Sequence, residues 1–154
     1  MKISISRVFD APVAKVWQAW SDPTQLMRWW GPKEFTSPAC TMDFKVGGKY
    51  HFCMRAPDGK DYWSTGVYKE IIPMQKIVCS DSFADAEGNV VPASYYNMPG
   101  DFPLEMLVVV TFEADGNKTK MHIEQDGHLD GQTSEMATQG WNQSLDKLAA
   151  SLSL

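Results

Sequence analysis

The sequence predicts an α+β fold in which a curved antiparallel sheet of about seven strands wraps around a long C-terminal helix. The first observation is the hydrophobic periodicity, which is two through the middle of the chain and helical near both ends. The second is the shortness of most connections between predicted strands, which is typical of an antiparallel meander. The sheet must bury one face, and the last helix is the only predicted element long enough to cover it. We expect a single domain over residues 1–154.

A strand and two short helices are predicted at the beginning of the chain. Apolar and polar side chains alternate over residues 2–9, as expected of a strand. Residues 10–20 change to a helical period, with an apolar stripe formed by Val13, Val16, Trp17 and Trp20. Asp22 is a suitable N-cap for a second short helix, which Gly31 and Pro32 are expected to end.

Two adjacent tryptophans, Trp29 and Trp30, are expected at the end of this second helix. With Leu26 they fall at positions i, i+3 and i+4, so both rings flank one apolar stripe. Both can cover the same surface, one deep in the molecule and one at its rim. We interpret one of the two rings as a wall of a cavity mouth.

Further strands are predicted where apolar and polar residues alternate in the middle of the chain. They span residues 40–45, 48–55, 62–71, 76–83, 104–113 and 118–126. Residues 84–103 form a long connection with several aromatic side chains, which we interpret as a flap over one end of the sheet. Residues 131–154 are predicted to form the long helix, with a stripe of Trp141, Leu145, Leu148 and Leu152.

Strand alternation assigns side chains to the two faces of the predicted sheet. The residues expected to face the long helix include Tyr50, Phe52, Met54, Thr119, Met121, Ile123 and Gln125. His51 and His122 fall on the opposite face, where we expect them to be solvated. The nine Met residues and the aromatic fraction of 12% are compatible with either a well-filled core or an internal cavity.

The chain resembles the family named after the activator of heat-shock-protein-90 ATPase. The motifs that carry the resemblance are FDAPVAKVWQAWSDP, LMRWWGP, VGGKYHFCMRAPDGK, VTFEADGNKTKM and the tail GW-x-x-SLDKLAASL. They occur in this order and cover nearly the whole chain. The resemblance implies the helix-grip fold of the SRPBCC superfamily, which includes START domains, polyketide cyclases and birch-pollen-allergen-like proteins.

The resemblance also implies a function, because this superfamily holds hydrophobic small molecules between sheet and helix. We therefore expect an apolar or aromatic small molecule to bind in an internal cavity against the C-terminal helix. The resemblance and the strand alternation together suggest a set of candidate ligand-binding residues. These are Trp30, Tyr50, Phe52, Met54, Trp63, Met121, Met136, Gly140, Trp141 and Ser144. Ser80, Gln125 and the flap tyrosines are further polar groups expected near the cavity.

An enzyme of cyclase or hydrolase type, using a cavity acid or tyrosine, is the alternative function. The carboxylates in predicted strands are Asp81, Glu105, Glu124 and Asp126. Glu105 and Glu124 are next in sequence to the inward residues Met106 and Ile123, so their side chains are expected on the opposite, outer face of the sheet. We interpret all four strand carboxylates as surface groups. No sequence motif for an activated nucleophile is present, and no catalytic residue is assigned.

The sequence predicts no metal site and no cofactor. His51, His122 and His128 lack the spacings of metal-binding motifs, and Cys40, Cys53 and Cys79 contain no CxxC pair. The odd cysteine count indicates reduced thiols and a cytoplasmic protein. This location also agrees with an N-terminus that lacks the apolar segment of a signal peptide.

The net charge of the chain and its distribution limit the classes of partner that we expect. The net charge is −5 and no Lys/Arg cluster forms a stripe, so neither nucleic acid nor an anionic membrane surface is an expected partner. No run approaches the roughly 20 apolar residues needed to cross a bilayer, so membrane insertion is not expected either. The third functional hypothesis is a protein-interaction module, for which an exposed apolar patch around Trp29 would be the sign. Eukaryotic co-chaperones of the family join a separate chaperone-binding domain to a domain of this kind. The motifs of this chain match only the second domain, so a chaperone interaction is not expected. The resemblance nevertheless implies a stress-response setting. The sequence is compatible with a homodimer as well as with a monomer.

Overall fold

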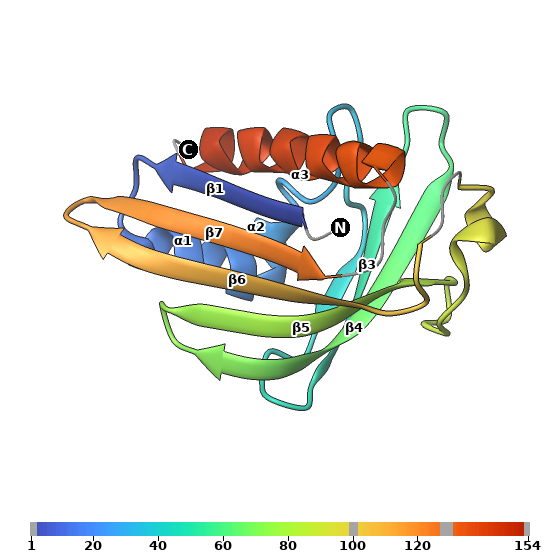
Figure 1. Ribbon diagram of the computed structural model, residues 1–154, viewed down its shortest axis with the longest axis horizontal. Coiled ribbons are helices and arrows are strands. Elements are labelled where there is room, and N and C mark those ends of the chain that lie inside the picture. Colours follow the sequence, from blue (N-terminus) through green and yellow to red (C-terminus); the bar gives the residue numbers. More distant parts are fainter. Residues whose placement is uncertain (1–2, 99–101, 127–130, 153–154) are drawn as a thin grey trace.

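The computed structural model describes residues 3–98, 102–126 and 131–152 (Figure 1). Its strands are β1 (Ile3–Phe9), β2 (Cys40–Met42), β3 (Lys49–Arg55), β4 (Asp61–Ile72), β5 (Lys76–Ala84), β6 (Met106–Asp115) and β7 (Lys118–Asp126). Its helices are α1 (Val13–Ser21), α2 (Pro23–Leu26) and α3 (Gly131–Ser151), with a short 3-10 helix, η1 (Ala93–Tyr96). The seven strands form one antiparallel sheet in the order β1-β7-β6-β5-β4-β3-β2, which confirms the predicted α+β fold.

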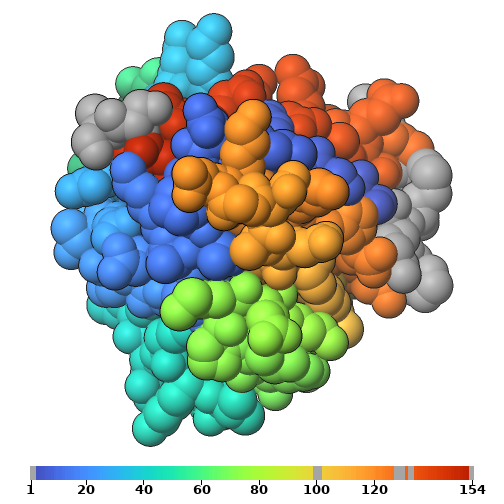
Figure 2. All heavy atoms as spheres, turned by 90° about the vertical axis from the view of Figure 1, so that its left-hand side faces the viewer, coloured from blue at the N-terminus to red at the C-terminus, as the bar shows by residue number. Residues whose placement is uncertain are grey.

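The sheet curves so that β3 and β4 rise at an angle to β6 and β7, and α3 runs along β1 (Figure 1). The three helices cover the same face of the sheet, because their buried side chains belong to one core cluster with the inward residues of the strands. At one end of the molecule, α1 and the β4–β5 and β6–β7 hairpins lie side by side, where the blue, green and orange atoms meet (Figure 2).

The register of the strands confirms the predicted assignment of faces. Tyr50 pairs with Gly66 and Ile123 pairs with Val110, and the inward side chains of these pairs belong to the core. Both histidines that the structure describes lie on the opposite face. His122 Nδ1 lies 2.7 Å from the Ser6 hydroxyl, and the His51 ring lies at the outer side of the sheet.

The second helix is shorter than its periodicity predicts. Asp22 caps it as expected, since its Oδ1 accepts a hydrogen bond of 2.9 Å from the Thr24 amide. Regular helix ends at Leu26, and the next turn carries the two tryptophans, whose amides still donate to the Leu26 carbonyl at 3.2 and 3.0 Å. Gly31, with φ of 103°, then reverses the chain in a conformation that favours glycine.

The long helix is held on the sheet by apolar burial and by one charged group. Leu145 and Leu148 are fully buried against the sheet. At the edge strand, Arg7 Nη2 donates to Asp146 Oδ1 at 2.7 Å and to the Asn142 carbonyl at 3.0 Å. Burial of each leucine contributes about 1.5–3 kcal/mol, whereas the half-exposed ion pair contributes about 1 kcal/mol or less.

The chain after β5 packs against the end of the sheet, in the position predicted for a flap. The hydroxyl of Tyr96 donates to the Ala84 carbonyl and accepts from the Trp63 amide. The ring of Phe83 contacts those of Tyr96 and Phe102, at centroid distances of 6.2 and 5.4 Å. Residues 99–101 of this segment lie outside the described residues.

Replacing Gly140 with alanine should stabilise the protein by about 1 kcal/mol, because glycine is a poor helix former. An added Cβ would meet only Pro32 Cγ at 3.7 Å, an ordinary contact. The expected rise in melting temperature is about 2–4 °C. Gly66→Ala is the control: there the Cβ would lie 1.9 Å from the Ser80 carbonyl oxygen, so melting temperature should fall. An unchanged or lower melting temperature for Gly140→Ala would show that α3 needs glycine at this position.

Candidate functional site

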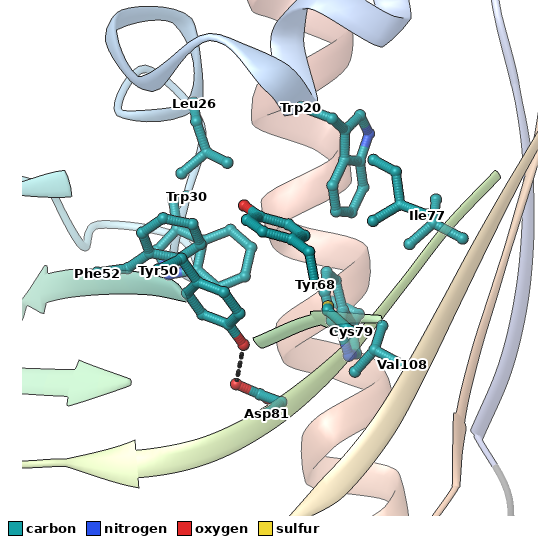
Figure 3. A pocket seen from close by; sticks show the side chains of 12 residues that line it. Trp20, Leu26, Trp30, Tyr50, Phe52, Tyr68, Ile77, Cys79, Asp81 and Val108 are labelled. Carbon is teal, nitrogen blue, oxygen red and sulfur yellow. Dashed lines mark hydrogen bonds between the residues drawn. The ribbon is translucent and has the colours of Figure 1, made fainter. Parts of the chain in front are cut away.

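A small cavity lies between the sheet and the three helices (Figure 3). Its volume is about 30 Å³, which is room for about one or two water molecules. Its walls come from α1, α2 and the turn after it, strands β3 to β6, and α3. Among the described residues, the walls are mostly aromatic and aliphatic, Asp81 is the only carboxylic acid in them, and they contain no Lys, Arg or His.

Four tryptophans form a closed ring of contacts around one side of the cavity. The centroid distances are 4.8 Å from Trp20 to Trp29, 5.7 Å from Trp29 to Trp30, 5.8 Å from Trp30 to Trp141 and 6.2 Å from Trp141 back to Trp20. Trp30 also lies 5.0 Å from Phe52. Rings thus pack continuously from Phe52 across to Trp141, and a guest larger than water requires at least one of them to move.

The adjacent tryptophans have different surroundings. Trp29 is fully buried, and its indole nitrogen donates to the Ala19 carbonyl at 3.0 Å. Trp30 is half-buried and lines the cavity. This agrees with the predicted pair of one deep ring and one ring at the rim. Because Trp29 is fully buried, its own ring cannot belong to an exposed apolar docking patch.

Two indole N–H groups at the cavity lack an acceptor. Among the described residues, Trp20 Nε1 and Trp30 Nε1 are buried and have no hydrogen-bond partner, and both residues line the cavity. Trp141 differs, since its Nε1 donates to Gln125 Oε1 at 2.9 Å. A buried donor without a partner costs about 1–3 kcal/mol. An acceptor such as water or a ligand oxygen would remove that penalty.

Asp81 and Tyr50 form the polar centre of the cavity. Asp81 is partly exposed as a residue, but its carboxyl points inward to the Tyr50 hydroxyl (Figure 3). The hydroxyl oxygen of Tyr50 lies 2.9 Å from Asp81 Oδ1 and 2.8 Å from the Ser80 carbonyl oxygen. The hydroxyl has a single proton, so it cannot donate fully to both acceptors. A protonated Asp81 that donates to Tyr50, while Tyr50 donates to Ser80, satisfies every group.

Burial extends the pH range of this neutral form of Asp81 up to about pH 6, and the ionised form dominates at neutral pH. Desolvation raises its pKa to about 6, although the hydrogen bond from Tyr50 opposes that rise. Burial also raises the pKa values of Tyr50, Tyr68 and Cys79, so these three lining groups are neutral near pH 7. Asp81 is therefore the only lining group that titrates between about pH 4 and pH 8.

Gly66 makes room for the tyrosine of this pair. It lies opposite Tyr50 in the β3–β4 register. A Cβ on Gly66 would lie 2.5 Å from Tyr50 Cε2 and 1.9 Å from the Ser80 carbonyl oxygen. The absence of a side chain therefore lets the Tyr50 ring lie flat against β4 and reach Asp81.

Four of the ten predicted ligand-binding residues line the cavity: Trp30, Tyr50, Phe52 and Trp141. Two others are buried elsewhere in the molecule. Met121 lies in the core cluster, and Ser144 is buried on α3. A role in ligand binding remains a prediction for all of these residues.

The remaining predicted residues also lie away from the cavity. Met54 packs against Gly31, and Met136 is half-buried on α3. Trp63 lies on the opposite face of the sheet, stacked on His51 at a centroid distance of 4.3 Å. Gly140 faces Pro32 and not the cavity.

The interpretation of Asp81 as a surface carboxylate is wrong. Ile77, Cys79 and Asp81 alternate along β5 and all line the cavity. The period of two along this strand could have revealed the inward direction of Asp81. It also places the Ser80 side chain on the other face, where its hydroxyl accepts from the Val67 amide at 2.9 Å. Of these two neighbours, Asp81 lines the cavity and Ser80 does not.

The cysteine thiols are poor nucleophiles. Burial raises the pKa of Cys40 to about 12 and that of Cys53 to about 11, and it raises the pKa of Cys79 as well. Because the thiolate is the reactive form, none of the three is activated near pH 7.

Within the described residues, no group of three or more His, Cys, Asp or Glu side chains is placed to hold a metal ion. Among the helices that the structure describes, none has the length and apolar character to cross a membrane.

Comparisons with known proteins agree on the family. The sequence matches no curated protein. A protein from Chromobacterium violaceum is 30% identical, with a TM-score of 0.78 and coverage of 99% of this chain and 97% of that one. A protein from Arthrobacter aurescens is also 30% identical, with a TM-score of 0.79 and coverage of 99% and 86%.

The AHSA1 protein from Silicibacter pomeroyi shares the fold at 22% identity, with a TM-score of 0.79 and coverage of 99% and 98%. The family model described as "Activator of Hsp90 ATPase homolog 1-like protein" matches residues 10–153. This match spans nearly the whole chain, in agreement with the motifs quoted from the sequence. The chain therefore belongs to the Activator of Hsp90 ATPase homolog 1-like family.

Proposed function

We propose that the protein binds a small apolar or aromatic molecule in the cavity between the sheet and α3. The observation that carries this proposal is the pair of unpartnered indole N–H groups, on Trp20 and Trp30, in walls that are otherwise aromatic and aliphatic. Small-molecule sites commonly combine such walls with a few polar groups that orient the ligand. A ligand oxygen, or a water molecule beside the ligand, would accept from these indoles, and the rings would cover the apolar part of the ligand.

Trp30 is the wall residue best suited to move. In the ring of four tryptophans, Trp29 and Trp141 are held by hydrogen bonds to Ala19 and Gln125. The indole nitrogen of Trp30 has no such bond, and the ring is half-buried. Its displacement therefore breaks no hydrogen bond and would enlarge the cavity toward the surface.

Trp30→Ala should increase the uptake of a neutral apolar fluorescent probe, N-phenyl-1-naphthylamine, by about tenfold in affinity, because it opens space beside Phe52. Fluorescence titration measures this change. Trp63→Ala is the matched control, since it removes a tryptophan from the outer face and should leave uptake unchanged. Native mass spectrometry of wild-type protein from its own host should also detect a retained small molecule. Absence of uptake in both wild type and Trp30→Ala would contradict the proposal.

A second function, acid–base catalysis on the bound molecule, is favoured by the Asp81–Tyr50 pair. A carboxyl group with a pKa of about 6, facing a cavity and bonded to a tyrosine hydroxyl, is suited to give or take a proton near neutral pH. The test is incubation of the retained molecule with wild-type protein, followed by mass analysis. Chemical conversion that Asp81→Asn abolishes would support catalysis, whereas an unchanged molecule would leave binding alone.

A further inference from the structure

We propose that the ligand is a primary amine with an aromatic or aliphatic body, and that Asp81 binds its ammonium group. This inference rests on the proposed function, because it names the class of molecule for the same cavity. It follows from the charge of the lining residues, from the rings that adjoin the carboxyl group, and from the balance of protons on binding.

The charge of the walls excludes anions and favours a cation. Within the part of the chain that the structure describes, Asp81 is the only carboxyl group that lines the cavity, and no Lys, Arg or His lines it. An anionic ligand would have no counter-charge and would face a carboxylate at neutral pH. A neutral ligand would leave the ionised Asp81 buried without a charged partner, which is unfavourable. An ammonium group supplies the missing partner and three hydrogen-bond donors.

The rings around Asp81 are suited to the same group. Tyr50 is bonded to Asp81 and stacks on Phe52 at a centroid distance of 4.4 Å. Tyr68 lies 5.6 Å from Tyr50, and Trp30 lies 5.0 Å from Phe52. Aromatic faces attract an ammonium ion within about 6 Å of the ring centroid. The carboxyl group thus provides the charge, and the rings cover the cation and the apolar body attached to it.

The number of protons released when the amine binds depends on pH. Below about pH 6 the free protein holds a proton on Asp81, and an alkyl ammonium group, like that of lysine, keeps its own proton up to about pH 10. Formation of the ion pair therefore releases the Asp81 proton to solvent at pH 5 and releases none at pH 8. The other titratable lining groups, Tyr50 on β3, Tyr68 on β4 and Cys79 on β5, stay neutral throughout this range because burial raises their pKa values.

Isothermal titration calorimetry with three ligands of matched shape tests the inference. The ligands are phenethylamine, the neutral 2-phenylethanol and the anionic 3-phenylpropionate, each titrated into wild type and Trp30→Ala at pH 5 and pH 8. Phenethylamine should bind at least about tenfold tighter than the alcohol at pH 8, and the acid should bind weakest. Between pH 8 and pH 5, the amine affinity should fall by about tenfold, since Asp81 must lose a proton on binding at the lower pH. Titrations in buffers of different ionisation enthalpy should show proton release at pH 5 only.

Two variants separate the local carboxylate from general charge. Asp81→Asn should abolish both the preference for the amine and its pH dependence. Glu113→Gln, which neutralises an exposed carboxylate on β6, should keep both. If the alcohol and the neutral probe bind but the amine binds no tighter, the inference is wrong and the proposed function stands. If none of the three ligands and no neutral probe binds to either protein, the proposed function fails and the inference fails with it.

Discussion

Replacing Trp29 with alanine should lower the free energy of unfolding by about 3–5 kcal/mol, the largest loss expected from a single substitution in this protein. Trp29 is fully buried, so its removal leaves a cavity of the volume of an indole. It also leaves the Ala19 carbonyl without the indole donor at 3.0 Å. Since domains of this kind are stable by about 5–15 kcal/mol, much of the total would be lost.

Urea unfolding followed by circular dichroism measures this loss, and the adjacent Trp30→Ala is the matched control. Trp30 is half-buried and its indole has no hydrogen-bond partner, so its removal should cost about half as much or less. The two tryptophans thus differ in purpose: Trp29 stabilises the fold, and Trp30 forms a wall that can move. Equal losses for the two variants would contradict this division.

The fold could be predicted because its information is local and periodic. The alternation in β3 and β7 placed Phe52 and Ile123 on the inner face without reference to any partner strand, and the register confirms it. The N-cap at Asp22 is equally local, since its partner is two residues away. Where the local signal competes with packing, prediction was less accurate: regular helix stops at Leu26 although the stripe continues to Trp30.

The candidate site was only partly predictable, because its geometry depends on contacts between distant segments. The size of the cavity is set by how Trp30 and Trp141 pack against each other, and they are far apart in the sequence. Gly66 looks unremarkable in the sequence, yet the Tyr50 ring occupies the place of its side chain. Asp81 was assigned to the surface together with Glu105 and Glu124, whose alternation places them there, although its own position along β5 indicated the inner face.

Asp81→Asn should stabilise the protein at pH 8 by up to about 3 kcal/mol and leave its stability at pH 4 nearly unchanged. The pKa of Asp81 is raised in the folded state, from 3.8 to about 6. The folded protein therefore holds this proton more tightly than the unfolded chain does. The stability of wild type should fall as pH rises from about 4 to about 6, and this loss should be constant above that range. A shift of this size corresponds to about 3 kcal/mol, and asparagine, which cannot ionise, avoids it.

The measurement is the difference in unfolding free energy between wild type and Asp81→Asn, taken at intervals from pH 4 to pH 8. This difference cancels the contributions of the partly exposed carboxylates Asp61 and Asp85, whose pKa values are lowered by hydrogen bonds and whose effect on stability has the opposite sign. Tyr50→Phe should move the decline to higher pH, because the Tyr50 hydrogen bond holds the pKa of Asp81 down. Glu113→Gln, which removes an exposed carboxylate on β6, is the control substitution. If the difference between Asp81→Asn and wild type is the same from pH 4 to pH 8, then the pKa of Asp81 is not raised, and its carboxyl is hydrated in solution instead of enclosed in the cavity.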